Sequence, residues 1–400
     1  MSQSAKLALP LAPALLSART PVHYDQGRQS WQVFSYADVL RVLTSHEEFS
    51  QEYLDETHMQ PRTAAPAISH PAYAAMWGRD GDAHRDLRGL VREPFSTRTL
   101  KLLEQQIRAI ADALLDGLLS TGTGEVEFMG AFARAFTNRV ICNIMGVDMT
   151  YDTQFARWVE EFSAAQVINQ VPPQLDLVAF FSQLLEERRH IPGQGLVDAL
   201  IEAEHAGAQI AGKPLSEQDL QGYLFSLLFA GSETTGTSLG NALLAFVEYG
   251  CLEELAADHA RLPVAIEESL RWNPSFPAVM LWARKDLSLG GHDVRAGQAV
   301  TAWVSAANRD PAKFDDPDSF NSHRQPNPHL SFGWARHLCL GKPLAQLELR
   351  VAMEALLERL PLPVELAPDK PVTYRQGIVN ALVEAHFRFF PGAVAVAGRT

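Results

Sequence analysis

One cysteine lies in a sequence context that suits metal binding. Cys339 belongs to the loop at residues 332–341 (FGWARHLCLG), which is followed by Pro343 and an amphipathic stretch, so we expect the cysteine near the start of a helix. Backbone N–H groups and the positive end of the helix dipole there favour a thiolate, the form of cysteine that binds metals. The glycines at positions 333 and 341 would let a flat ligand approach the backbone.

Two other interpretations of Cys339 have to be weighed. A buried, unreactive thiol is a common fate of a free cysteine. Zinc is disfavoured, because a structural zinc site needs about four cysteine or histidine ligands and no second pair with suitable spacing lies nearby in the sequence.

A second unusual segment, residues 230–237 (AGSETTGT), consists of small, hydroxylated and β-branched residues. It lies in the middle of a predicted helix that starts with a capping box at Ser216 and Asp219 and ends at Gly250, a length of about 50 Å. Such residues have low helix propensity, so we expect the helix to be weakened at its centre. By itself the segment fits a packing defect or a close helix crossing equally well.

Two pairs of charged or polar residues have helical spacing. His84 and Arg88 would share one face of a helix and could bind carboxylates, although residues of this kind are more often on the surface. Glu268 and Arg271 would be neighbours on another helix, where such a pair is usually solvated and contributes about 0.2–0.5 kcal/mol.

The elements that must position these residues are mainly helices. Apolar residues recur at helical spacing over residues 100–270, whereas residues 287–304 and 383–389 show the short, alternating runs of strands. No fixed-period repeat or linker marks a domain boundary, so we expect a single domain over residues 1–400. The helix-rich core is predicted at about 80–270 and 341–360, and the β-containing segments at about 20–50, 275–310 and 365–392. The fold class is mainly α with small β-sheets.

Composition excludes several classes of protein. The chain has 400 residues, of which 46% are hydrophobic and 20% charged, so it is neither disordered nor fibrous. Its net charge of −13 makes a nucleic acid an unlikely partner by electrostatics. Three cysteines predict a reducing, cytoplasmic compartment. The apolar stretch at residues 7–16 is too short for a membrane anchor.

The cysteine loop resembles the heme-binding signature of the cytochrome P450 family, Phe-Gly-x-Gly-x-His-x-Cys-x-Gly. Every position of that signature matches except one, where Ala335 replaces the second glycine. Four further segments resemble the family in the same order along the chain. They are the His84 and Arg88 pair for the heme propionates, the segment from Ala230 to Thr235 in the long central helix, the Glu268 and Arg271 pair, and the segment 320–324 with Arg324, which joins that pair.

The resemblance implies a cytochrome P450 fold, with a long central helix over heme b and a cysteine-ligand loop beneath it. Cys339 would bind the iron, and Thr234 beside Glu233 would deliver protons where the helix leaves room for O2. The other residues implied to bind the cofactor are His84, Arg88, Ala230, Gly231, Phe332, Gly333, His337 and Gly341. The family often has a propionate-binding arginine at the position of Leu281, and Arg284 lies three residues too late to replace it, on a strand face that we expect to point away.

The implied activity is a monooxygenase reaction on a small or medium hydrophobic substrate, such as an aromatic compound, terpenoid, fatty acid or steroid, by hydroxylation, epoxidation or oxidative dealkylation. The substrate pocket is implied to include Ser226, Phe229, Pro277, Ala278, Val279, Ile378 and Val379. Residues 51–77 resemble the variable lid of the family, and residues 166–173 have no interpretation from sequence.

Nothing in the chain resembles a fused reductase, so electrons are expected from a ferredoxin or flavodoxin-type electron donor with its reductase. A docking patch could combine Arg336, Lys342 and Arg350 with Arg92, Arg98 and Lys101, but scattered solvated bases are an equal alternative. Two other functions stay open. One is a heme-thiolate peroxygenase, dehydratase or isomerase, and the other is a catalytically silent heme-binding sensor.

Overall fold

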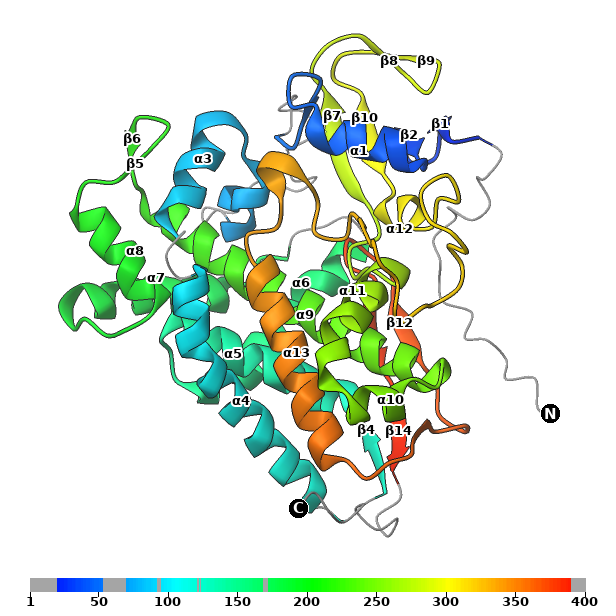
Figure 1. Cartoon of the computed structure of the whole chain (residues 1–400). Helices are drawn as coiled ribbons and strands as arrows, with labels where there is room; N and C mark the ends of the chain where they lie inside the picture. The colour runs from blue at the N-terminus through cyan, green and yellow to red at the C-terminus, as the bar shows by residue number, and fades with distance from the viewer. Residues whose placement is uncertain are drawn as a thin grey trace.

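The structure is a computed structural model that describes residues 20–52, 70–91, 95–120, 122, 124–167 and 172–389. The helices gather around one long central helix, and a smaller β-containing part lies beside them (Figure 1). Of the segments singled out above, residues 53–69 and 168–171 and Arg92 lie outside the described residues.

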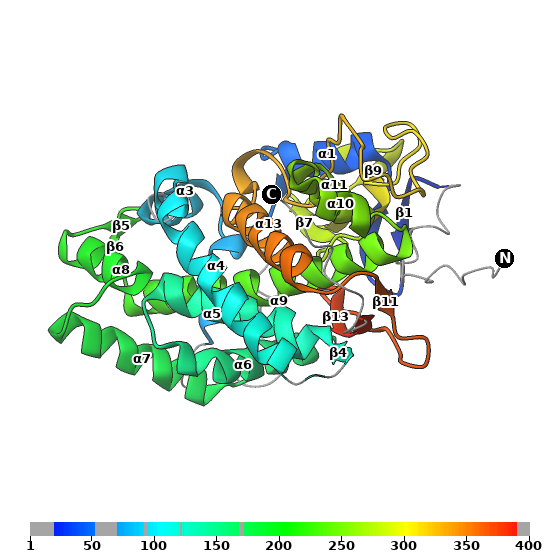
Figure 2. The same ribbon diagram turned by 60° about the horizontal axis from the view of Figure 1, so that its bottom comes forward.

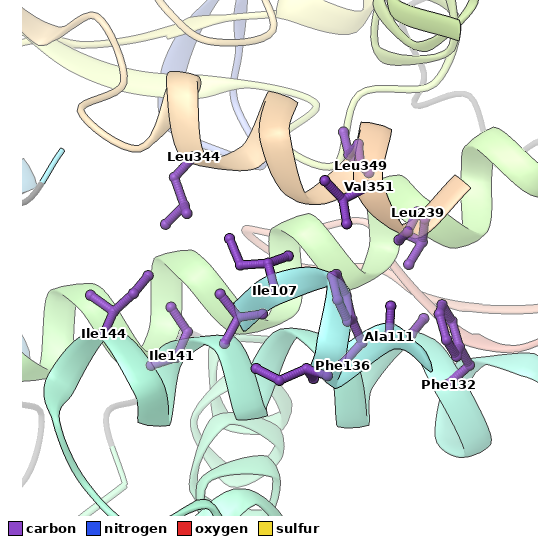
Figure 3. Packing of buried hydrophobic residues seen from close by; sticks show 14 of the residues in the cluster. Ile107, Ala111, Phe132, Phe136, Ile141, Ile144, Leu239, Leu344, Leu349 and Val351 are labelled. Atoms are coloured by element: carbon purple, nitrogen blue, oxygen red, sulfur yellow. The ribbon is translucent and has the colours of Figure 1, made fainter. Parts of the chain in front are cut away.

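The central helix is α9 (Glu217–Glu248). Ser216 and Asp219 form the predicted capping box, in which each side chain bonds the other residue's backbone N–H, and Tyr249 caps the other end. The helix passes between α5 (Ala135–Met145) and α13 (Lys342–Arg359), whose apolar side chains cover it on both sides (Figure 3). Because both faces are covered, most of α9 is buried.

The expected weakening at the centre of α9 is not seen as a break, because the segment 230–237 stays α-helical. Thr234 Oγ1 in this segment and Ser238 Oγ just after it bond back to the carbonyl groups of Ala230 and Thr234, one turn earlier. Such bonds destabilise a helix slightly but are compatible with its continuity.

The remaining helices pack around this centre, as Figure 2 shows from a second direction. They are α3 (Gly81–Leu90), α4 (Thr97–Ser120), α6 (Asp152–Val167), α7 (Leu175–His190), α8 (Leu196–His205), α10 (Leu252–Ala257) and α11 (Leu262–Trp272). Short helical turns are η2 (Pro71–Ala74), η3 (Met76–Gly78), η4 (Met129–Arg134), η5 (Met149–Tyr151), η6 (His259–Arg261) and η7 (Ala335–His337).

A five-stranded sheet forms the β-containing part. Its order is β1 (Val22–Asp25), β2 (Ser30–Val33), β10 (Ala299–Ala302), β7 (Val279–Ala283) and β3 (Phe49–Ser50). Together with α1 (Tyr36–Thr44) and α12 (Val304–Ala307), it encloses a second hydrophobic core, separate from the one around α9.

The other strands form small sheets. β4 (Glu125–Glu127) pairs with β14 (His386–Phe389), which pairs with β11 (Val364–Leu366). The two-stranded pairs are β12 (Thr373–Arg375) with β13 (Ala381–Glu384), β8 (Leu287–Leu289) with β9 (His292–Val294), and β5 (Gln209–Ile210) with β6 (Lys213–Pro214). The predicted fold class, mainly α with small sheets, is confirmed.

Within the described ranges, no helix combines the length and the apolar character that a bilayer span requires.

Candidate functional site

The cysteine loop folds into a tight turn ahead of α13. The Cys339 N–H donates to Phe332 O at 2.8 Å, which closes the loop on itself. Gly333 has φ +68° and Ala335 has φ +54°, so both adopt the left-handed conformation that favours glycine. The loop therefore keeps its glycine-type geometry although one of the two positions is alanine. Gly341, with φ −78°, needs no such freedom.

The surroundings of Cys339 combine exposure with burial. Its side chain is exposed, yet burial is the largest influence on its thiol and raises its pKa. The exposure of the side chain and the effect of burial on its pKa are both expected for a thiol that lies deep in the protein and faces an open space there. The backbone N–H groups of Gly341 and Lys342 and the charges of Arg88 and Lys342 oppose the effect of burial. These groups would stabilise a thiolate once a metal cation pairs with it.

One turn of α9 is also exposed, as the Cys339 side chain is. Ala230 is exposed, although the nine residues before it on this helix are buried, and Thr234 lies one turn further along. Gly231 also has a packing role. A Cβ atom there would lie 2.4 Å from Ile141 Cδ1, so the glycine allows α5 to pack closely against α9. Its contact with the cofactor stays a prediction.

The carboxylate of Glu233 is buried and bonds to groups on α6 and β12. Its Oε2 accepts a hydrogen bond from Ser163 Oγ at 2.5 Å, and its Oε1 accepts one from Arg375. Burial raises the pKa of Glu233, although Ser163 and Arg375 oppose the shift. Glu233 and Thr234 thus bond to other groups in the structure, rather than to each other.

A cleft connects Glu233 with the surface. Glu233, Arg375 and Glu160 line it, and the Glu160 side chain is 70% exposed. Ser232 and Asn138 also line this cleft. Their side-chain atoms Ser232 Oγ and Asn138 Oδ1 are buried and have no hydrogen-bond partner in the described part of the chain. The carboxylate is therefore within reach of solvent through a cleft of mixed polar and apolar lining.

The histidines of the two predicted propionate segments lie together. His84 is buried on α3, and the centroid of its ring is 4.2 Å from that of His337 in the cysteine loop. Burial, together with the charges of His337 and Arg88, lowers the pKa of His84 to about 4. Arg88 donates to Leu338 O at 2.8 Å, so it also ties α3 to the cysteine loop.

Asp80, which the sequence did not single out, anchors this group. Its Oδ1 is 2.8 Å from His337 Nε2, and its Oδ2 accepts bonds from Ser50 Oγ at 2.5 Å and Arg284 at 2.7 Å. Burial would raise the pKa of Asp80, but the bonds from His337 and Ser50 and the charges of His337 and Arg284 hold it below its usual value. Arg284 thus reaches the cluster only through Asp80, and Leu281 is buried in the second core.

The predicted charged pair on α11 is fully buried, not solvated. Arg271 donates to both oxygens of Glu268, at 2.7 and 2.8 Å, and both side chains are 0% exposed. Arg324 donates to the same carboxylate at 3.1 Å. The other N–H groups of Arg271 donate hydrogen bonds to the carbonyl oxygens of Asn308, Pro317 and Ser319. This network therefore fixes the segment that leads to the cysteine loop.

The predicted pocket residues have different environments. Phe229 is buried in an aromatic group with Phe162, Phe225 and Trp77, at ring distances from 4.8 to 6.1 Å. Ser226 donates to Gly222 O and accepts from the Met76 N–H, so its hydroxyl is already engaged. The rest range from a buried Val379 and a 45% exposed Ile378 to the partly buried Pro277, Ala278 and Val279.

One member of the predicted basic patch is engaged within the chain. Arg350 pairs with Glu104 and Glu354, and its part in docking stays a prediction. Lys342 lies over the Phe332 ring at 5.3 Å. Arg336, Arg98 and Lys101 are exposed.

Sequence reasoning did not find Asp80, Ser163 or Arg375. Asp80 directly precedes the predicted propionate helix, so its position was a usable signal. Ser163 and Arg375 lie 70 and 142 residues from Glu233, and no local pattern links them to it.

Comparisons with known proteins agree on one family. The family model described as cytochrome P450 matches residues 257–386. The mycinamicin IV hydroxylase/epoxidase of Micromonospora griseorubida is 35% identical over 344 residues, which cover 84% of this chain and 83% of that protein. The cytochrome P450 monooxygenase PikC of Streptomyces venezuelae is 30% identical over 390 residues, covering 96% and 91%.

A solved structure is similar over nearly the whole chain. The crystal structure of CYP109E1 from Bacillus megaterium in complex with testosterone has a TM-score of 0.84 at 27% identity, and the match covers 95% of this chain and 97% of that one.

Proposed function

This chain belongs to the cytochrome P450 family and is a heme-thiolate monooxygenase, and on that premise we propose that it oxidises a hydrophobic molecule of medium size with electrons from a separate donor protein. The observation that carries the proposal is the Cys339 thiol, which lies deep in the protein but faces open space.

The residues of the site fit a heme. Cys339 would bind the iron, while His84, Arg88 and His337 would hold the propionates. Two buried nitrogen atoms near these residues, His46 Nε2 and Arg79 Nε, have no partner within the described ranges. Arg79 directly precedes Asp80, and His46 lies beside His337. Orphaned donors of this kind suit an anionic ligand.

When bound through a thiolate, heme supplies the activation of dioxygen and the insertion of one oxygen atom into the substrate. The protein's own contribution on the α9 side is proton handling. Thr234 Oγ1 holds a hydrogen that it donates to Ala230 O in this structure, and a rotation of the side chain would turn the same hydrogen toward the open space.

Glu233 is suited to resupply that proton. Burial raises its pKa, which favours a protonated carboxyl group that can give up its proton, although Ser163 and Arg375 oppose the shift. The cleft with Glu160, Ser232 and Asn138 connects it with solvent. Because Glu233 is bonded to Ser163 and Arg375, transfer to Thr234 requires either a bridging water or a movement that releases one of these bonds.

The substrate proposal rests on the apolar surroundings and on the relatives. Trp77 is 38% exposed and packs on the buried Phe225 and Phe229 near the open turn of α9, and burial of apolar area would supply most of the binding energy. One relative is named as a mycinamicin IV hydroxylase/epoxidase, and one similar structure holds testosterone. We therefore propose a substrate of about that size, oxidised by hydroxylation or epoxidation.

For the electron donor we propose an acidic ferredoxin or flavodoxin that binds near Arg336, Lys342, Arg98 and Lys101. Turnover with such a donor should weaken as salt increases, because exposed charges are screened. Turnover independent of salt contradicts this docking mode. The free thiols of Cys142, Cys251 and Cys339 support a reducing compartment such as the cytoplasm.

The experiment that tests the function begins with the reduced carbon monoxide difference spectrum. We expect the spectrum of a thiolate-bound heme in the wild type and its loss in Cys339→Ala. A colourless protein after expression with ample heme, or an unchanged spectrum in the variant, refutes the proposal. Product that depends on a reductant separates a monooxygenase from a silent sensor, and product formed with peroxide alone identifies a peroxygenase.

A further inference from the structure

A histidine outside the predicted site has an unsatisfied nitrogen atom. His46 lies just after α1, and its Nε2 is buried without a hydrogen-bond partner among the residues that the structure describes. Buried polar atoms are nearly always satisfied by protein, water or ligand, so either a water or a ligand is expected to bind this atom.

His46 belongs to a row of three imidazoles. Its ring centroid is 5.9 Å from that of His337, which is 4.2 Å from that of His84. His84 and His337 are the residues we assign to the heme propionates, so His46 extends the same group of donors on the side of α1.

The charges around His46 favour an anion. Arg336 and Arg284 act on it as positive charges, and Asp80, which pairs with Arg284, acts as a negative one. The carboxylate of Asp80 is already bound by His337, Ser50 and Arg284, so it does not satisfy His46. The excess of positive charge around His46 suits a carboxylate from a ligand.

The position at which the family often has a propionate-binding arginine is occupied by an apolar residue in this chain. Leu281 is 4% exposed and packs in the second core, where its partner across the sheet is Val300. Arg284 uses its Nε for Phe49 O and its Nη2 for Ser50 Oγ and Asp80, so these two nitrogen atoms are already engaged.

We propose that His46 donates a hydrogen bond from Nε2 to a heme propionate and thereby supplies the donor that Leu281 lacks. The inference rests on the proposed function, since it requires a bound heme. It assigns a binding residue to the segment that follows α1, which none of the sequence motifs reached.

The test measures how fast the heme-loaded protein loses heme to an excess of apomyoglobin. His46→Phe keeps a ring but removes both nitrogens, and we expect its heme dissociation rate to rise about tenfold to a hundredfold, as for a lost hydrogen bond to a charged group. His46→Gln returns an N–H donor and should restore a rate near that of the wild type. The propionate bending mode in the resonance Raman spectrum should shift in His46→Phe and return in His46→Gln.

The matched control is His23→Phe. His23 also has a buried nitrogen without a partner in the described structure, its Nδ1, but it stacks on Phe34 in the region of the five-stranded sheet. Its rate should equal that of the wild type.

Equal rates for His46→Phe and wild type overturn the proposal, and so do equally fast rates for the Phe and Gln variants, which would indicate a packing role. In either case an intact carbon monoxide spectrum would leave the heme-thiolate function standing. Absence of that spectrum from the wild type would instead refute the function itself.

Discussion

Replacing Ala335 by glycine should stabilise the protein, which few single substitutions do. Ala335 holds φ +54° in the cysteine loop, a conformation that costs a residue with a Cβ atom about 1–2 kcal/mol. Glycine removes this strain but makes the unfolded chain more flexible, which costs about 0.4–1 kcal/mol. The net gain is about 0.5–1 kcal/mol. For a chain of 400 residues this corresponds to a rise in the thermal midpoint of about 1 °C.

The assay is thermal unfolding followed by far-ultraviolet circular dichroism, on heme-loaded samples with equal heme content. Gly333→Ala is the opposite control, because φ is +68° there and the added Cβ would lie 3.3 Å from His337 O. Gly341→Ala is the neutral control, since φ is −78° and the nearest atom would be Cys339 Sγ at 3.9 Å. An unchanged or lower midpoint for Ala335→Gly, with the expected loss for Gly333→Ala, refutes the strain argument.

Three further outcomes are expected. Thr234→Ala should consume reductant while product falls and peroxide rises, because the hydroxyl proton is lost; an unchanged yield of product per reductant removes Thr234 from the mechanism. Glu268→Gln should lower the free energy of unfolding by about 3–5 kcal/mol, because Arg271 keeps its buried charge without a counterion; a loss below about 1 kcal/mol in urea titrations contradicts this. Burial lowers the pKa of His70 to about 4 from a usual value of 6.5, so the unfolded chain gains a proton first and stability falls as the pH drops from 6.5 to 4. His70→Asn should abolish up to about 3 kcal/mol of that fall, and equal pH profiles of thermal unfolding would refute the assignment.

The local elements of the fold could be predicted because their causes are local. The capping box at Ser216 and the apolar spacing after it gave the start and extent of α9, and the structure places both as expected. A helix is fixed by contacts within four residues, so its pattern is readable in one dimension. The alternating residues near the C-terminus likewise form β13 and β14.

Whether a residue is buried, solvated or packed against another helix could not be predicted in the same way. Glu268 and Arg271 have the spacing of an ordinary solvated pair, and only the family resemblance indicated that Arg324 joins them; in the structure both side chains are fully buried and bonded to Arg324 or to each other. Gly231 lies in a motif that resembles a cofactor contact, yet its missing side chain admits Ile141. In each case the deciding neighbour comes from another element, so the residue's own sequence context does not contain it.

The amino-acid sequence by itself determined that Cys339 sits in a loop able to present a thiolate, that a long helix carries Thr234, and that the chain resembles one enzyme family. Only the tertiary structure decided what surrounds these groups. Arg375 and Ser163 hold Glu233, and His46 comes to lie beside His337, because side-chain packing brings together residues far apart in the chain. Periodicity records the geometry of a single helix or strand, whereas burial and charge at a site depend on how several such elements pack.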